Sequence, residues 1–245
     1  MIRPKNACTT VLLCIVMTLA LSIDPSLAAA EDGVVPGLND QVIVTAVESG
    51  VRHLVSLQHE DGSIHDRGHE TAMTSLAIMA MASIGVQPSD PGPNGDSMRR
   101  AIDYVVSNDG ADRKPKQDEQ GYFGRHDGSR MYGHGIVTLM LTEMVGMGAD
   151  AKQDNEIRVA LDAAIGLILS AQAVRKPPAY QGGWRYAPDA NDADLSASVW
   201  QLMALRSAKN DSIAVPSEAI EQAVEYLKRS YTSPVDAEGN VTPVN

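Results

Sequence analysis

The chain has 245 residues, with 20 Lys and Arg against 31 Asp and Glu and a net charge of −11 at pH 7. This length suffices for one domain with a substantial core. The acidic excess argues against a protein that binds nucleic acid or an anionic membrane surface. Both cysteines, Cys8 and Cys14, lie near the N-terminus. Beyond them the chain can form neither a disulfide nor a thiolate metal site.

The first thirty residues have the pattern of a secretory signal peptide. Arg3 and Lys5 give a basic start, Ala7–Leu21 is an apolar run without charge, and Ala28–Ala30 supplies small residues for a signal peptidase. An uncleaved anchor is the alternative, but the run is shorter than the roughly 20 residues of a membrane span. We therefore predict cleavage behind these alanines and an exported protein, periplasmic or secreted, whose mature chain begins near Glu31.

A short Gly-x-apolar turn recurs along the rest of the chain. Its glycines are 59, 61 and 57 positions apart, at Gly62, Gly121, Gly182 and Gly239. Before each turn the sequence predicts an amphipathic helix, over residues 47–58, 97–107, 156–172 and 217–229. Asp96 before the second of these helices, and Pro216-Ser217 before the fourth, are expected to mark their starts.

After each of the first three turns a second kind of helix is predicted, over residues 71–84, 134–147 and 196–207. These helices carry at most one charged residue each. Helices that are apolar on nearly every side are buried on nearly every side, whereas the first set carries charge on one face. Alternating outer and inner helices, about 60 residues per pair, predict an all-α array that curves. The predicted domain covers residues 40–245 and contains no sheet.

Two of these segments carry a resemblance to a known family. Leu54–Ile64 resembles the Gln-x-x-x-Gly-x-Trp motif of squalene cyclases and protein prenyltransferase β-subunits, and Ile165–Tyr186 resembles it with a longer insertion. In the second and fourth segments, Asn108 and Tyr231 stand near the expected glutamine. The chain thus resembles a prenyltransferase/squalene-oxidase-repeat protein, of the kind often exported in bacteria. This resemblance implies an α/α toroid.

The number of repeats predicts an incomplete toroid. Closed rings of this family resemble five to seven helix pairs, and the chain holds about three and a half pairs at about 60 residues each. We therefore expect an open arc with an exposed apolar edge beside the third inner helix. The chain is then a partial product, or it pairs with another chain, and self-association through the open edge is one such pairing.

The loops before the inner helices are rich in ionisable and aromatic residues. Equivalent positions in a repeat array lie on one rim, a sensible place for a ligand. The predicted ligand-binding residues are Trp184, Tyr186, Tyr132, His134 and His69. The alternative is that the loops are simply polar surface.

Two aspartates have both a structural and a catalytic interpretation. Asp192 and Asp194 suit the N-terminus of the third inner helix, where carboxylates cap backbone amides. The run Asp192-Ala193-Asp194-Leu195 also resembles the Asp-x-Asp-Asp motif of class II terpenoid cyclases. That resemblance implies Asp194 as the catalytic acid and Asp192 as its partner, with Leu195 in place of the last aspartate. A cyclase cavity also needs aromatic faces, and the chain is only 4% aromatic.

No metal or cofactor is expected. His65, His69, His126 and His134 could hold a metal together with an aspartate, but separated histidines in loops are more often polar surface. A prenyltransferase zinc centre would need a cysteine, and neither a phosphate-binding loop nor a serine elbow is present.

Two functions remain open from the sequence. The first is an exported, non-catalytic binding or scaffold module that takes an isoprenoid, a glycan or a protein in its concave centre. The alternative is a diverged class II terpenoid cyclase, an isomerase or lyase that uses Asp194.

Overall fold

The computed structural model describes residues 40–65, 67–107 and 116–231. The predicted signal peptide, Asn108 and the Gly239 turn lie outside these residues. Contacts divide the chain into two compact units, residues 1–46 and 47–245. Of the first unit, the structure describes only residues 40–46, which form the first part of helix α2. The packing and the sites below belong to the second unit.

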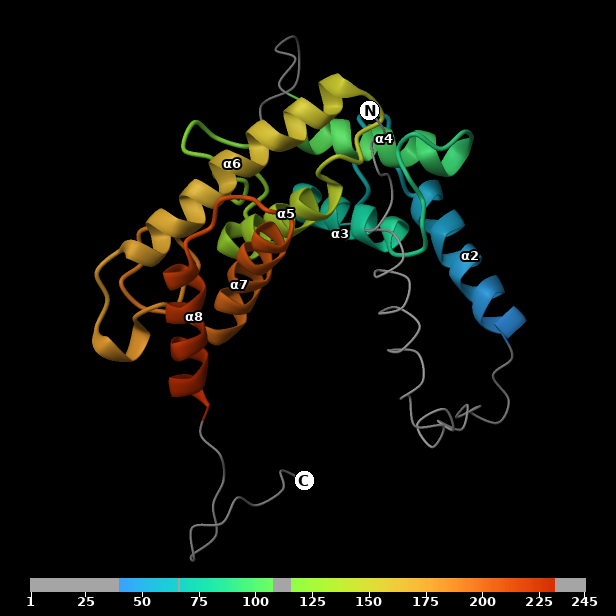
Figure 1. Cartoon of the computed structure of the whole chain (residues 1–245). Coiled ribbons are helices and arrows are strands. Elements are labelled where there is room, and N and C mark those ends of the chain that lie inside the picture. Colours follow the sequence, from blue (N-terminus) through green and yellow to red (C-terminus); the bar gives the residue numbers. More distant parts are fainter. Residues whose placement is uncertain (1–39, 66, 108–115, 232–245) are drawn as a thin grey trace, which may run out of the picture. The chain divides into compact units, whose positions relative to one another are not determined.

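The described residues form seven α-helices, one short 3-10 helix and no strand, which confirms the all-α prediction (Figure 1). The predicted helices are present with bounds that differ by up to seven residues. The helices are α2 (Asp40–Ser56), α3 (Glu70–Ala82), α4 (Pro93–Val106), α5 (Arg130–Met144), α6 (Ala151–Ala173), η3 (Pro178–Tyr180), α7 (Leu195–Asn210) and α8 (Ser217–Ser230).

Asp96 does not mark the start of a helix, contrary to the prediction from the sequence. Helix α4 begins at Pro93, with Gly92 at the N-cap position, because the fixed φ of proline suits the first helical residue. Asp96 lies inside the first turn and pairs with Arg99 at 2.7 Å. Helix α8 begins at Ser217, directly after Pro216, as predicted.

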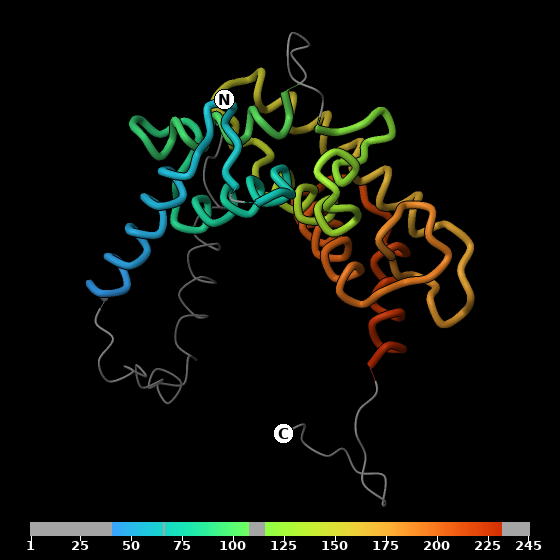
Figure 2. The backbone as a smooth tube through the Cα atoms, turned by 180° about the vertical axis from the view of Figure 1, so that it is seen from behind, coloured from blue at the N-terminus to red at the C-terminus, as the bar shows by residue number. Residues whose placement is uncertain are grey.

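The helices of the second unit pack in two rows. Helix α5 lies between α3 and α7, and α4, α6 and α8 pack against α3, α5 and α7 respectively (Figures 1 and 2). Twelve of the 15 residues of α5 are buried, against three of the 14 residues of α8. This difference follows the charge contrast between the two kinds of helix in the sequence.

Three turns attach the ends of these helices in the same way. The turn glycines have φ angles of 93°, 87° and 87° at Gly62, Gly121 and Gly182. A Cβ on each would lie within 2.4 Å of a backbone carbonyl oxygen of the following outer helix, on Arg100, Ala163 and Gln222. The left-handed φ and the close backbone approach both require glycine.

A glutamine braces each of these turns. Its Nε2 atom donates to the carbonyl oxygen of the turn glycine at 3.0 Å and to a carbonyl of the next outer helix at 2.8 or 2.9 Å. The three glutamines and their helix partners are Gln58 with Ser97, Gln117 with Ala160, and Gln172 with Ala219.

The glutamine of the second segment corrects the sequence prediction. Gln117 makes the contact, where Asn108 had been expected. It precedes Gly121 by four residues, as Gln58 precedes Gly62. The spacing between the glutamine and the turn glycine is not fixed, because Gln172 precedes Gly182 by ten residues.

The residue after each turn anchors it in the core and sets the register of the inner helices. Ile64, Phe123 and Trp184 are each at most 3% exposed. The backbone N–H of each donates to a side chain of the following inner helix, on Thr74, His134 and Ser198 respectively. These three positions are therefore equivalent in α3, α5 and α7.

Candidate functional site

A groove of about 420 Å³ lies between the N-terminal parts of α3 and α5. We call it the α3/α5 groove. Apolar and small residues form its floor: Ala72, Met73, Leu76, Gly133 and Ile136. The polar residues at its rim are His69, Arg130, Tyr132 and Tyr186, and Ser129 also lines the groove. A mostly apolar pocket with a few convergent polar groups is the common form of a small-molecule site.

Two tyrosines form an aromatic surface at the rim. The rings of Tyr132 and Tyr186 stack with centroids 5.5 Å apart and an angle of 24°. The guanidinium of Arg185 lies 4.6 Å from the centroid of the Tyr186 ring, a cation–π distance. The carbonyl of Tyr186 also accepts a hydrogen bond from the Met131 amide at 3.2 Å. The third turn is thereby fastened to the start of α5, which fixes the position of both rings.

The other two rim residues adopt unusual backbone conformations. His69 and Arg130 have φ angles of 54° and 56°, in the left-handed region that costs a non-glycine residue on the order of 1–3 kcal/mol. His69 is held by its Nδ1 atom, which donates to the Asp127 carbonyl at 2.9 Å. Both residues with this strained backbone conformation line the α3/α5 groove.

Asp127 fixes the start of α3 from the neighbouring segment. Its Oδ2 atom accepts hydrogen bonds from the backbone amides of Thr71 at 3.1 Å and Ala72 at 3.3 Å. A carboxylate at this position satisfies orphan amides and meets the positive end of the helix dipole. The loop of the second segment thus positions the groove residues of the first inner helix.

Three of the five predicted ligand-binding residues meet at this groove: His69, Tyr132 and Tyr186. The structure corrects the predicted place of the other two, Trp184 and His134, which lie in the core. Trp184 is 1% exposed, and its indole nitrogen donates to the Ile168 carbonyl at 2.8 Å. An aromatic residue beside a turn glycine packs inward here because the turn closes over the core.

His134 is fully buried, and both of its ring nitrogens are engaged. Nδ1 accepts from the Phe123 amide at 3.4 Å, and Nε2 donates to the Ala164 carbonyl at 3.2 Å. Burial lowers the pKa of His134 to about 4, although the Ala164 carbonyl acts in the opposite direction. The imidazole is therefore neutral at physiological pH and serves as a structural link between two segments.

This burial predicts a dependence of stability on pH. The pKa of His134 is about 4 in the folded state and about 6.5 in an unfolded chain, so the unfolded state binds more protons between these values. We expect the free energy of unfolding to fall as the pH drops from about 6.5 towards 4. Denaturation by urea at several pH values, with His134→Gln as the comparison, measures this. The prediction would be contradicted if the free energy of unfolding changed with pH in the same way in both proteins.

Asp194 caps α7. Its Oδ1 atom accepts from the Ala197 amide at 3.0 Å, from the Tyr132 hydroxyl at 3.3 Å and from the Ser196 hydroxyl. The Ser196 bond contributes most to lowering the pKa of Asp194; partial burial opposes it, and the other two bonds add to it. A general acid needs the opposite shift. Asp192 lies apart from this cluster, with its carboxylate 3.6 Å from the Arg185 guanidinium.

Substitutions at Asp194 separate capping from catalysis. If the carboxylate only caps α7, Asp194→Asn should leave the melting temperature nearly unchanged, and Asp194→Ala should cost about 1 kcal/mol. Thermal unfolding of both variants measures this difference. A catalytic acid would give the same melting temperature for Asp194→Asn, but this variant would no longer form product.

The groove residues that the sequence did not indicate are those of the apolar floor. Met73, Leu76 and Ile136 have the same character as core residues of their helices. Only the packing of α3 beside α5 leaves them at a hollow. Met73, with 44% of its surface exposed, is the clearest case.

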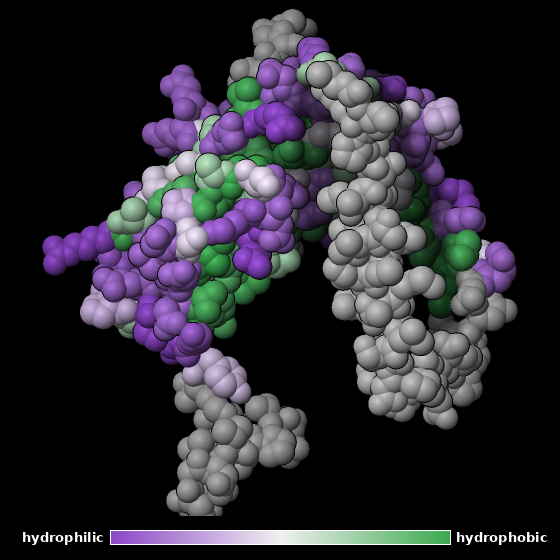
Figure 3. Space-filling model, viewed as in Figure 1, coloured by the Kyte–Doolittle hydropathy of each residue, from purple (hydrophilic) through white to green (hydrophobic). Residues whose placement is uncertain are grey.

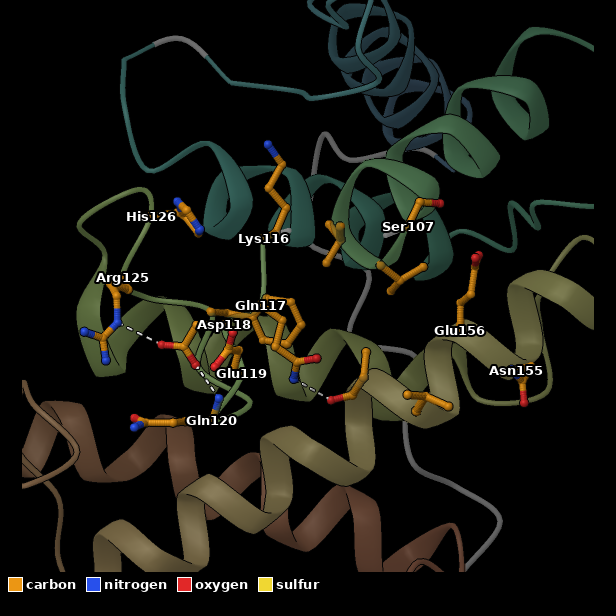
Figure 4. A pocket seen from close by; sticks show the side chains of 15 residues that line it. Ser107, Lys116, Gln117, Asp118, Glu119, Gln120, Arg125, His126, Asn155 and Glu156 are labelled. Carbon is orange, nitrogen blue, oxygen red and sulfur yellow. Dashed lines mark hydrogen bonds and ion pairs between the residues drawn. The ribbon is translucent and has the colours of Figure 1, made fainter. Parts of the chain in front are cut away.

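A larger hollow of about 670 Å³ lies on the outer row, between α4 and α6 (Figure 4). Its charges are partly paired, since Arg125 donates to Asp118 at 2.8 Å. Ser107 and Lys116 border the hollow. They flank residues 108–115, which the structure does not describe. We therefore assign it no ligand.

The candidate metal ligands do not converge. Within residues 40–65, 67–107 and 116–231, no group of three or more His, Cys, Asp or Glu side chains could hold a metal ion. His65 stacks on His59 with ring centroids 4.4 Å apart, and His134 lies in the core. In the same part of the chain, every helix is too short or too polar to cross a membrane.

Comparisons of the sequence with the models of known protein families and with curated proteins find no match.

Proposed function

We propose that this chain is an exported binding module of the α/α-toroid type and that the α3/α5 groove holds its ligand without catalysing a reaction. Three features support the toroid interpretation. Inner helices lie side by side in one row, an outer helix packs on each, and the same glutamine–glycine contact recurs at three turns. These features agree with the resemblance to prenyltransferase/squalene-oxidase-repeat proteins.

The apolar floor of the groove indicates which class of ligand it binds. Its volume of about 420 Å³ lies within the range of about 300–1,000 Å³ that is usual for small-molecule sites. The floor offers hydrocarbon and no side-chain hydrogen-bonding group, so it suits an isoprenoid chain better than a glycan. Arg130 and the two tyrosines can hold a polar end of such a ligand at the rim.

The geometry disfavours the cyclase alternative. Protonation of an alkene requires a carboxyl group that stays protonated, whereas three donors stabilise the anionic form of Asp194. A cyclase also needs aromatic faces around the substrate, and the floor of the groove contains none. We therefore propose binding as the function.

A calorimetric titration of the mature protein with farnesol tests the proposal. Met73→Lys places a charge on the floor of the groove. Ile84→Lys is its matched control, because both parent side chains are 44% exposed and Ile84 lies outside the groove. We expect wild type and Ile84→Lys to bind equally and Met73→Lys to bind at least roughly tenfold more weakly. Absence of binding, or equal loss in both variants, would overturn the proposal.

Incubation with squalene tests the alternative directly. We expect the mature protein to release no cyclised product, as judged by gas chromatography of the extracted lipids. A cyclised product that wild type forms and Asp194→Asn does not would establish the cyclase instead.

A further inference from the structure

An apolar stripe on helix α7 stays exposed within the part of the chain that the structure describes. Leu195, Val199 and Met203 are 44%, 37% and 45% exposed. Only six of the 16 residues of α7 are buried, although α7 belongs to the same row as α5. In Figure 3 apolar surface is visible over α7, between more polar surfaces on either side.

The register of the inner helices shows what this stripe is suited to receive. Because Ser198 is equivalent to His134, Val199 and Met203 are equivalent to Gly135 and Leu139 of α5. A Cβ at Gly135 would lie 2.6 Å from the Gln201 side chain of α7, and Leu139 is only 8% exposed. In α5 these positions are covered by the next inner helix.

The same holds for α3. Ser75 is the position equivalent to Gly135, and it is completely buried where α3 packs against α5. The stripe on α7 therefore corresponds to a face that the next inner helix covers in α3 and in α5. Its chemistry calls for another helix packed along it.

A hollow of about 550 Å³ extends the stripe towards α8. It is lined by apolar residues of three helices, Leu139, Leu202, Met203, Ile220 and Val224. Two opposite charges, Glu143 and Arg206, also line it. The Glu143 carboxylate accepts from the Ser207 hydroxyl at 2.8 Å, and within the described part of the chain Arg206 forms no ion pair.

We infer that this surface is a dimer interface in which the α7 helices of two copies pack antiparallel across a two-fold axis. A two-fold axis sets the same patch against itself, so the patch must be self-complementary. This one is, because an apolar stripe meets its copy, and Arg206 can pair with Glu143 of the partner subunit. Met203 stands near the middle of α7 and therefore near the axis.

The interface is small, because one helix and part of a second contribute to it. Stable interfaces bury about 800 Å² per partner, and smaller ones belong to transient complexes. We therefore expect a reversible dimer whose population rises with protein concentration. This inference is independent of the proposed function, since the α3/α5 groove lies at the N-terminal parts of the other inner helices.

The absence of cysteine beyond residue 30 gives a direct test. Met203→Cys in the mature chain should form a disulfide-linked dimer under mild oxidation, because the two copies of this position lie near the axis. Val159→Cys is the control. The Val159 side chain is 62% exposed, and it lies on α6, in the other row of helices from α7. Non-reducing electrophoresis should show the dimer with the first variant only.

Light scattering of the unmodified mature chain provides the second measurement. Wild type should approach twice the monomer mass as the concentration rises, and Met203→Glu should raise the dimer dissociation constant more than roughly tenfold. Farnesol binding should be the same in both. A monomer at every concentration, as expected if another protein or the chain's own residues cover the stripe, would overturn the inference. Equal crosslinking of the two cysteine variants would do so too.

Discussion

Replacement of Trp184 by alanine is expected to lower the free energy of unfolding by about 3–5 kcal/mol, the usual cost of removing a fully buried tryptophan. The side chain is 1% exposed, and its loss would leave a cavity where the third turn meets the core. The Ile168 carbonyl would also lose the donor that lies 2.8 Å away. Urea denaturation should show a lower midpoint at an unchanged slope.

Phenylalanine at the same position is the matched control. Phe123 occupies the equivalent place after the second turn and is also 1% exposed, so the fold accepts this side chain there. Trp184→Phe should therefore cost much less than Trp184→Ala. If Trp184→Ala were as stable as wild type but no longer bound farnesol, Trp184 would be a ligand-binding residue and not a core residue.

The helical pattern of this fold could be read from the sequence because it rests on local information. Charge along one face of a segment, or its absence, predicts which helices are covered, and the glycines mark the turns between them. The bracing glutamine of the second segment was misplaced for a physical reason. Gln117 is selected by a contact with the Ala160 carbonyl, 43 residues away, and no local pattern contains that contact.

The site was predictable only in part, for a similar reason. Loop position indicated His69, Tyr132 and Tyr186, which do line the groove. Trp184 was also predicted as a ligand-binding residue but lies in the core, because the sequence does not tell which way a side chain beside a turn points. Apolar floor residues such as Met73 look like core residues until the packing of two helices leaves them at a hollow.

Gly182→Ala is the second substitution with a large expected effect. The glycine has a φ of 87°, and the left-handed region costs an L-residue about 1–2 kcal/mol. A Cβ there would also lie 2.1 Å from the carbonyl oxygen of Gln222. That atom belongs to the backbone of α8 and cannot rotate away, so the turn or the helix must shift, at a further cost of about 1–3 kcal/mol.

Gly85→Ala separates these two costs. Gly85 has the same φ of 87°, but a Cβ there would meet no atom within 4 Å. We therefore expect Gly85→Ala to lower the free energy of unfolding by the conformational cost alone, and Gly182→Ala to lower it by clearly more. The difference between the two variants in urea denaturation measures how closely the third turn approaches α8. Equal costs would mean that the turn yields easily, and that glycine is required there for its φ alone.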